Sequence, residues 1–313
     1  MLKYTAKRLL QSLVTLFIIA TIVFSLMRLM PIEGYFQNFD KLDQNQIQAA
    51  LKSMGLLDPL PVQLKNFYIQ ILHGDFGKSL IFRPNVPCLE IIGDKAPVSI
   101  LMGLASIAIA LVLGLPLGIA MARGKSKFWD KFGTAFIVFI TAVPAAVYYL
   151  LIQLYCTDWF GVPILFSTDD PSSWILPTVS LALPNIAYYA MWLRRYMVDE
   201  LNKDYIKLAR AKGVSSKNIM KNHVFRNAFV PMVQYLPTSI LYTVAGSIYI
   251  ESLYSVPGMG GLLVNVIQRQ DNNMVQALVL IYSAVGIVGL LLGDLLMRAM
   301  DPRISFTKEG GAR

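Results

Sequence analysis

The sequence predicts an all-α integral membrane protein with six transmembrane helices and both termini in the cytoplasm. Hydrophobic residues make up 55% of the chain and charged residues only 15%, which is too apolar for a soluble protein of this length. Apolar stretches long enough to cross a bilayer recur along the chain, and Lys and Arg gather in alternate segments between them. Together these observations indicate a multi-pass membrane protein.

The first predicted span is Leu9–Met30, about twenty apolar residues that follow Lys3, Lys7 and Arg8. A signal peptide would have a shorter apolar core and a cleavage site of small residues, which residues 28–31 lack. We therefore expect residues 1–30 to be a retained N-terminal segment and first helix. Residues 31–96 are mixed in character and are predicted to form an extracytoplasmic loop region.

Residues 97–297 are predicted to form a core of five further spans, which includes a polar cytoplasmic segment at residues 194–229 and is followed by a cytoplasmic tail at residues 298–313. Proline removes a helical hydrogen bond and favours a kink, so the prolines in these spans suggest a protein that changes shape. The predicted spans are Pro97–Ala122, Gly133–Tyr155, Trp174–Leu193, Val230–Ile250 and Ala277–Met297. The prolines are Pro116, Pro144, Pro177, Pro184, Pro231 and Pro237.

The distribution of positive charge sets the orientation. The segments on the side of the N-terminus carry 20 Lys and Arg, whereas those on the opposite side carry seven. Cytoplasmic segments of membrane proteins are enriched in these residues, so both termini and the polar segment are predicted to be cytoplasmic. The net charge of +9 is thereby explained by topology, and nucleic-acid binding is not expected.

Tyr205–Asn222 is the most informative stretch, and we call it the elbow. Between Arg194 and Arg226 the chain has nine Lys and Arg and three Asp and Glu, and burying all of them in a bilayer would cost roughly 30–40 kcal/mol. The stretch therefore lies outside the membrane. A short amphipathic helix is predicted first, then a left-handed end at a glycine, then an N-cap and a second helix. The residues that predict these features are Tyr205, Leu208, Ala209, Lys212, Gly213, Ser215, Ile219 and Met220.

No motif for catalysis, cofactor binding or metal binding stands out. Gly118 and the Gly124–Lys125–Ser126 run resemble a phosphate-binding loop, but their spacing has one residue too many. The two histidines, His73 and His223, have no partner at metal-ligand spacing. We therefore expect no catalysis, cofactor or metal in this polypeptide. Cys88 and Cys156 make no disulfide framework, although a single bridge between them is conceivable.

Two carboxylates at the ends of predicted spans leave alternatives open. Glu251 precedes a turn with Pro257 and Gly258. It is either a hydrated carboxylate at the membrane edge or part of a re-entrant outer gate, which is tolerated where it lines a cavity. Asp294 lies four residues before Arg298, and an ion pair within the helix is favoured over a proton or ion site.

At the elbow the sequence resembles the B-type permease subunit of binding-protein-dependent ABC importers of the dipeptide/oligopeptide/nickel family. The peptide-importer pattern reads Tyr-x3-Ala-Arg-Ala-Lys-Gly followed by His-x2-Arg-Asn-Ala-x2-Pro. The family's more general motif begins with a glutamate that this chain lacks, which leaves open how the elbow is braced. The matching residues are Tyr205, Ala209, Arg210, Ala211, Lys212, Gly213, His223, Arg226, Asn227, Ala228 and Pro231.

The resemblance extends over the whole chain. Residues 74–79 fit the family's loop after the first span, residues 251–260 fit its outer turn, and Asp301–Pro302–Arg303–Ile304 fits its C-terminal end. It implies the type I permease fold of an ABC importer, in a prokaryotic cytoplasmic membrane, with a coupling helix in the elbow. The chain would form half of the translocation path for short peptides. It would not itself be an enzyme.

The resemblance also implies partners and residue roles. The partners are a homologous second permease, two cytoplasmic ATPases that bind the ATP, an extracytoplasmic substrate-binding protein and the lipid bilayer, with no nucleic acid. The outer gate or path would include Glu251, Pro257 and Gly258. The residues implied in ATPase coupling are Tyr205, Ala209, Arg210, Gly213, Val214, Ser215 and Ile219.

Other functions stay open at this point. The same family also carries nickel complexes and other small solutes, and selection is expected mostly in the separate binding protein. An ion- or proton-coupled secondary transporter is the alternative from another class, and it predicts ionisable residues near the middle of spans. None lies at the centre of a predicted span. A membrane scaffold would leave the proline-bent helices without a purpose.

Overall fold

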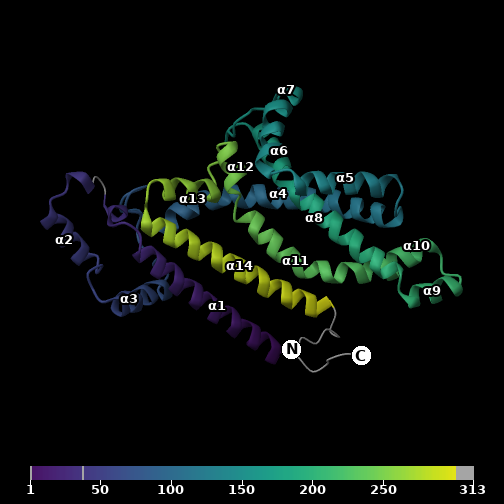
Figure 1. Cartoon of the computed structure of the whole chain (residues 1–313), viewed down its shortest axis with the longest axis horizontal. Helices are drawn as coiled ribbons and strands as arrows, with labels where there is room; N and C mark the ends of the chain where they lie inside the picture. The colour runs from purple at the N-terminus through teal and green to yellow at the C-terminus, as the bar shows by residue number, and fades with distance from the viewer. Residues whose placement is uncertain (1, 37–38, 301–313) are drawn as a thin grey trace.

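Long helices set side by side form the body of the molecule in the computed structural model, which describes residues 2–36 and 39–300 (Figure 1). α1 (Leu2–Arg28) and α14 (Asn272–Met300) run next to each other, and α11 (Arg226–Val244) also packs against α14. α4 (Cys88–Arg123) and α8 (Ile175–Leu201) make the most extensive helix–helix contact. The predicted all-α class is confirmed for the described residues.

Within the described residues, three helices are long and apolar enough to cross a membrane on their own, namely Thr5–Arg28, Cys88–Arg123 and Asn272–Ala299. A bent pair of helices, Phe128–Ala142 with Ala145–Phe160, counts as a fourth if it is a single span. α8 and α11 are less apolar and are not among these candidate spans. The six spans and the cytoplasmic termini therefore stay predictions.

The third predicted span is not one continuous helix. α5 (Phe128–Ala142) is capped at Val143, and the chain then turns by 108° into Ala145–Phe160, which we call the apolar arm. Pro144 lies at the break as the N-cap of the next helix, because proline has no N–H to continue the hydrogen bonding of α5. The kink predicted at Pro144 is thus confirmed, and it is a break. The arm comprises α6 (Ala145–Leu151), the π-helix η3 (Ile152–Cys156) and α7 (Thr157–Phe160).

Two other predicted helix boundaries are wrong. α11 ends at Val244 instead of continuing to Ile250, because Gly246 has a φ of +101° that breaks the helix before α12 (Ile248–Leu253). A second break then separates α12 from α13 (Met259–Gln268). α4 begins at Cys88, within the segment that was predicted to be loop. The other predicted kink prolines of the core lie within continuous helices.

The predicted loop region after the first helix (residues 31–96), which we call the outer loop region, folds against that helix. Arg28 Nε donates to Gln63 Oε1 at 2.7 Å, and the Tyr68 hydroxyl donates to the carbonyl of Phe17 at 2.9 Å. Figure 1 places this region at one end of the long axis, opposite the elbow. Its elements are η1 (Ile32–Tyr35), η2 (Phe39–Lys41), α2 (Gln44–Ser53) and α3 (Leu60–Leu72).

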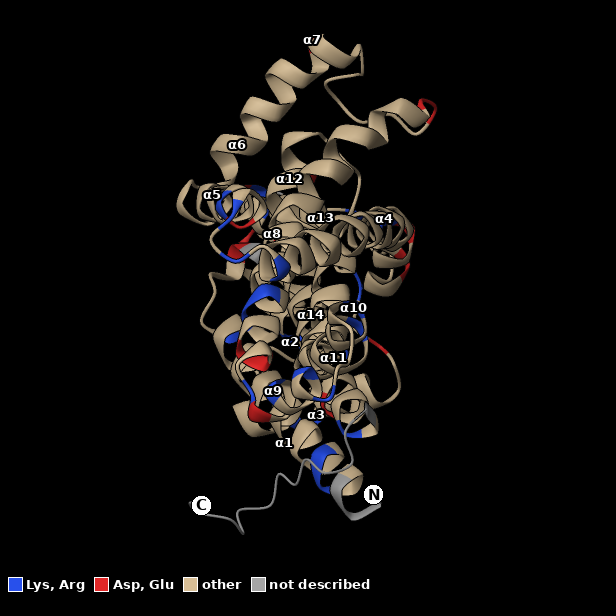
Figure 2. Cartoon of the chain, turned by 90° about the vertical axis from the view of Figure 1, so that its right-hand side faces the viewer, with Lys and Arg blue, Asp and Glu red and all other residues tan. Residues whose placement is uncertain are grey.

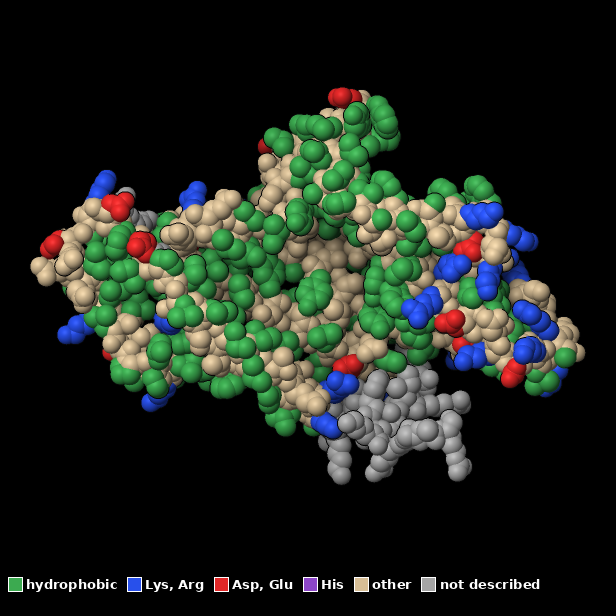
Figure 3. Space-filling view, in the orientation of Figure 1, with side chains coloured by type: hydrophobic (Ala, Val, Ile, Leu, Met, Phe, Trp, Pro, Cys, Tyr) green, Lys and Arg blue, Asp and Glu red, His purple; other side chains and the backbone are tan. Residues whose placement is uncertain are grey.

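Basic side chains are denser at one end of the long axis than at the other (Figure 3). Lys and Arg gather over the elbow end in the space-filling view, whereas hydrophobic side chains cover much of the middle (Figure 3). Figure 2 looks onto this basic end. The predicted tail charges at Arg303, Lys308 and Arg313, and residues 301–304 of the resemblance, lie outside the described residues.

Cys88 is buried and Cys156 lies on the arm, and both are free thiols. The remaining helical elements are η4 (Pro171–Trp174), α9 (Asp204–Ala211), α10 (Ser216–Asn218) and the π-helix η5 (Ile219–Phe225).

Candidate coupling elbow and outer gate

The predicted glycine corner is present between α9 and α10. Gly213 has a φ of +76°, the Gly213 N–H donates to the Arg210 carbonyl at 3.0 Å, and the Val214 N–H donates to the Ala209 carbonyl at 3.1 Å. This pair of bonds is a Schellman motif, which closes a helix at a left-handed residue. No atom lies within 4 Å of where a Cβ on Gly213 would be. Glycine is therefore favoured here by its backbone conformation and not by lack of space.

The cap at Ser215 is confirmed as well. Its hydroxyl accepts from the Asn218 N–H at 3.4 Å. The element that follows is not a separate short helix, however, because α10 passes into η5 and η5 passes directly into α11. The second half of the elbow is therefore the N-terminal end of the rod that contains α11.

The elbow buries a different side chain from those predicted. Ile206 is fully buried and packs in one cluster with Leu193 and Met197 of α8. Tyr205 and Leu208 point outward, with 39% and 56% of their surface exposed. Since Ile206 holds α9 onto the body, the exposed face of α9 is available to another molecule.

The seven residues implied in coupling fall into three groups by exposure. Ile219 is buried in the same cluster as Ile206, so its side chain stabilises the elbow and does not reach the outer surface. Ala209 and Val214 are half-buried. The exposed members are Tyr205, Arg210, Gly213 and Ser215.

A side-chain brace holds α9 to its neighbours. The Tyr205 hydroxyl donates a short hydrogen bond to Glu200 Oε1 and accepts from Asn227 Nδ2 at 2.7 Å. Asn227 Nδ2 also reaches Glu200 Oε1 at 3.3 Å. Burial of the ring and the Glu200 carboxylate raise the pKa of Tyr205 to about 12, so the phenol remains a donor at neutral pH. The brace ties α9 to the end of α8 and the start of α11, although the family's usual glutamate is missing.

The outer gate candidates meet in a buried polar cluster, which we call the outer knot. Glu251 is 2% exposed, which excludes a hydrated carboxylate at the membrane edge. It accepts from Ser99 Oγ at 2.8 Å and from the Gly261 N–H at 2.9 Å. Ser99 Oγ in turn accepts from the Met259 N–H at 2.8 Å. A Cβ on Gly258 would overlap the Glu251 carboxylate, so the glycine allows this close approach.

The outer knot joins three helices and adjoins a cavity. Ser99 comes from α4 and Glu251 from α12, while Met259 begins α13. The neighbouring cavity has a volume of about 440 Å³ and is lined in part by Glu251, Pro257 and Gly258. The three predicted gate residues therefore lie together, at the place where the two helix breaks meet α4.

Asp294 has partners on two other helices. Its Oδ2 lies 3.2 Å from Arg8 Nη1 of α1, and its Oδ1 accepts from Gln234 Nε2 of α11 at 3.2 Å. The preference for an ion pair over an ion site is supported, and this ion pair joins α14 to α1.

Sequence reasoning missed two polar clusters. Asp271 is fully buried and accepts from the Leu80, Ile81 and Phe82 N–H groups at 2.9–3.1 Å. This carboxylate holds the outer loop to the start of α14, where it also caps the helix through the Met274 N–H at 3.2 Å. An Asp just before an apolar helix is a readable capping signal, but the loop that it binds has no such signal.

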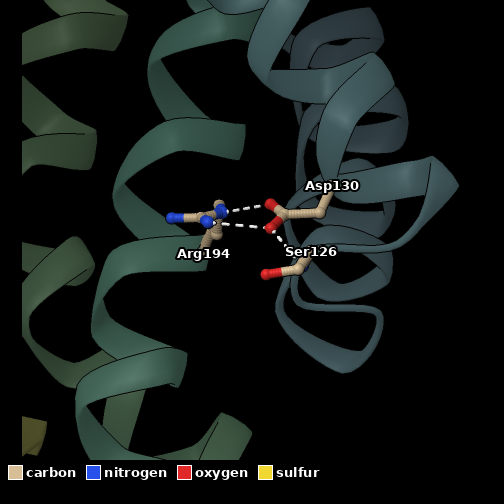
Figure 4. Close-up of polar contacts among 3 residues, drawn as sticks. All are labelled: Ser126, Asp130 and Arg194. Atoms are coloured by element: carbon tan, nitrogen blue, oxygen red, sulfur yellow. Dashed lines mark hydrogen bonds and ion pairs between the residues drawn. The ribbon is translucent and has the colours of Figure 1, made fainter.

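The second missed cluster lies between the start of α5 and the last turns of α8, and we call it the clasp (Ser126, Asp130 and Arg194). Arg194 Nε makes a short bond to Asp130 Oδ1, and Arg194 Nη2 donates to Asp130 Oδ2 at 2.9 Å (Figure 4). The Ser126 N–H donates to the same Oδ2 at 2.7 Å. From the sequence alone, Asp130 and Arg194 are interpreted only as loop charges.

Comparison with known proteins gives a family match over nearly the whole chain. Residues 114–306 match the family described as "Binding-protein-dependent transport system inner membrane component", and residues 1–115 match its N-terminal companion. The chain is 33% identical over 304 residues to the dipeptide transport system permease protein DppB of Lactococcus lactis, covering 97% of this chain and 99% of DppB.

Two further relatives have related names. The glutathione transport system permease protein GsiC of Salmonella typhimurium is 32% identical over 313 residues, covering 98% of this chain and 100% of GsiC. The oligopeptide transport system permease protein AmiC of Streptococcus pneumoniae is 38% identical over 216 residues, which cover 68% of this chain. The match spans less than half of AmiC, 43% of its length.

Proposed function

Because this chain belongs to the family of binding-protein-dependent transport system inner membrane components, we propose that it forms half of the translocation path of an ATP-driven importer for short peptides. On this proposal the chain binds no ATP itself. Two cytoplasmic ATPases hydrolyse ATP, a homologous permease supplies the other half of the path, and an extracytoplasmic binding protein delivers the substrate.

The names of the relatives support peptides as the substrate class. DppB is named for dipeptides, AmiC for oligopeptides and GsiC for glutathione, which is itself a short peptide. Nickel or another small solute is the alternative within the same family. Uptake assays with the binding protein of this system distinguish these substrates.

The elbow is the observation that carries the coupling proposal. It presents an outward face with Tyr205 and Leu208 exposed, while Ile206 and the Tyr205–Glu200–Asn227 brace hold it to α8 and α11. An exposed apolar surface on a rigidly held element is suited to binding another protein. We propose that this face inserts into the ATPase, and that Arg210 and Ser215 border the contact.

The orientation proposed here follows from charge. The elbow end of the molecule is basic (Figures 2 and 3), and Lys and Arg favour the cytoplasmic side. The outer loop region and the outer knot then face the extracytoplasmic side. There we propose that Glu251, Pro257 and Gly258 belong to the outer gate, because α11 and α12 separate next to them.

An ion-coupled secondary transporter is supported less well. Such a protein needs an ionisable group available to the transported ion. Asp294, the candidate considered for that role, is already bound by Arg8 and Gln234.

The test is co-purification of the ATPase with the detergent-solubilised permease, comparing the wild type with Gly213→Pro. Proline fixes φ near −65° and removes the N–H, whereas Gly213 has φ +76° and donates to Arg210. We expect the amount of co-purified ATPase to fall at least tenfold.

The structure offers a matched control in Gly74→Pro. Gly74 has φ +75°, ends α3 through the same pair of hydrogen bonds, and has no atom within 4 Å of a Cβ. The two substitutions therefore cost about the same locally, but they lie at opposite ends of the molecule. Equal loss of ATPase in both variants, or no ATPase with the wild type, would count against the proposal.

A further inference from the structure

The clasp joins the helix that leads to the elbow with the helix that leads to the apolar arm. Arg194 lies about two turns before the end of α8, and only Asn202 and Lys203 separate α8 from α9. Asp130 lies in the first turn of α5, whose other end turns through 108° into the arm. A displacement of the elbow therefore reaches α5 most directly through these two side chains.

The clasp is built as a rigid joint. Asp130 is 5% exposed, and both of its oxygens are engaged by the two-pronged guanidinium of Arg194 (Figure 4). The third donor, the Ser126 N–H, comes from a turn in which Ser126 itself has φ +64°. Two parallel bonds between a guanidinium and a carboxylate fix direction as well as distance. α5 can neither slide nor rotate against α8 without breaking them.

The other contacts of α5 with the body are mainly apolar packing. One side of the helix packs on α4 and α8, and Gly133 lies so close to Met121 that a Cβ would overlap the thioether. The opposite side is apolar and exposed in the described chain. Its exposed residues are Phe128, Trp129, Phe132, Val138 and Phe139.

We propose that the clasp passes movement of the elbow to α5 and the arm, so that Asp130 and Arg194 are positioning residues for coupled transport. The role in transport rests on the proposed function, because it takes the elbow as the ATPase-binding element. The joint itself does not depend on that function: residues 130–160 and the end of α8 move as one body while the clasp is intact.

The experiment measures a distance across the joint by spin labelling. Cys156 on the arm provides one natural site, Lys203→Cys provides the second between α8 and α9, and Cys88 is fully buried and remains unlabelled. With the clasp intact we expect a narrow distance distribution that stays unchanged when ATP and vanadate are added to the assembled transporter. In Asp130→Asn we expect the distribution to broaden at least twofold.

The second readout is the ATP hydrolysed per peptide taken up by proteoliposomes, with trialanine as the probe. We expect Asp130→Asn and Arg194→Gln to retain hydrolysis while this ratio rises about tenfold. Combining Asp130→Arg with Arg194→Asp restores opposite charges, and we expect it to lower the ratio again. Arg194→Lys keeps the charge but loses the two-pronged geometry. If Asp130→Asn fails to fold, this variant takes its place in testing whether the clasp couples hydrolysis to uptake.

The matched control is the exposed ion pair Arg83–Asp94, which lies far from the elbow. Its atoms are 2.7 Å apart, but its side chains are 45% and 53% exposed, so Asp94→Asn should change neither readout. An unchanged distance distribution and ratio in the clasp variants would overturn the proposal. If the wild type binds no ATPase, the proposed function fails, whereas the distance distribution of the isolated chain still decides whether the clasp is a rigid joint.

Discussion

Replacing Asp271 with Asn tests how the outer loop is held to α14. The Asp271 carboxylate receives the N–H groups of Leu80, Ile81 and Phe82 and also the Ser79 hydroxyl at 2.6 Å. All four meet at one oxygen. An asparagine has only one side-chain oxygen. If that oxygen faces these four donors, the NH2 group faces the Met274 N–H, which then loses its acceptor.

The magnitude follows from the number and kind of bonds. A hydrogen bond to a charged group contributes about 1.5–3 kcal/mol and one between neutral groups about 0.5–1.5, so Asp271→Asn weakens each bond by about 1 kcal/mol. Because bonds to one acceptor do not add fully, we expect a total loss of about 2–4 kcal/mol. Since each 1.4 kcal/mol is tenfold, local opening should become roughly 30 to 700 times more frequent.

Hydrogen exchange of the Leu80, Ile81 and Phe82 amides measures this opening directly. Asp43→Asn is the matched control, because Asp43 also caps a helix, with Gln44 N–H at 2.8 Å, but is exposed. Asparagine is as good an N-cap as aspartate, so exchange should hardly change there. If exchange at residues 80–82 rises no more in Asp271→Asn than in Asp43→Asn, the assignment of Asp271 as the anchor is wrong.

Three further predictions concern helix packing, the outer knot and the elbow. Gly293→Ala should lower the free energy of unfolding by about 1–3 kcal/mol, because the new Cβ would overlap a backbone carbonyl of α11. Its control is Gly93→Ala, where the new Cβ meets open space. Thermal unfolding should show this control to be neutral or stabilising. Ser99→Ala should lower the free energy of unfolding by about 1–3 kcal/mol, because it leaves the buried Met259 N–H without its acceptor. Its control, Ser106→Ala, removes only a hydrogen bond within its own helix. Equal melting temperatures of the two variants would contradict this prediction. Tyr205→Phe should reduce ATPase co-purification by loosening the brace, and unchanged binding would show that the brace is dispensable.

The features that the sequence predicts correctly at the elbow depend on local signals. Gly213 and Ser215 act on backbone groups within five residues of themselves, so their roles are readable from sequence. The buried face of α9 is not, because Ile206 is selected by contacts with α8 and η5. An eight-residue helix is too short for its hydrophobic pattern alone to decide which side faces inward.

Polar contacts between residues far apart in the chain are the features of the fold that no sequence pattern indicates. Asp130 and Arg194 are 64 residues apart, and Ser79 and Asp271 are 192 residues apart. Charged residues near membrane ends are predicted as topology signals, and only the packing of the helices shows which of them pair. The break at Pro144 lies between these extremes: proline predicts a kink, but the size of the bend depends on what α6 packs against.

The π-helix η5 determines which side chains connect the elbow to α11. Ile219 and Val224 are both buried although five residues separate them. With the 3.6 residues per turn of an α-helix, five residues rotate a side chain by about 140°, which would leave Val224 on nearly the opposite face. The wider π turn returns Val224 to the side of Ile219. Rewinding this segment as an α-helix would bring His223 to the inner face instead, so the inner face of this rod depends on its winding as much as on its composition.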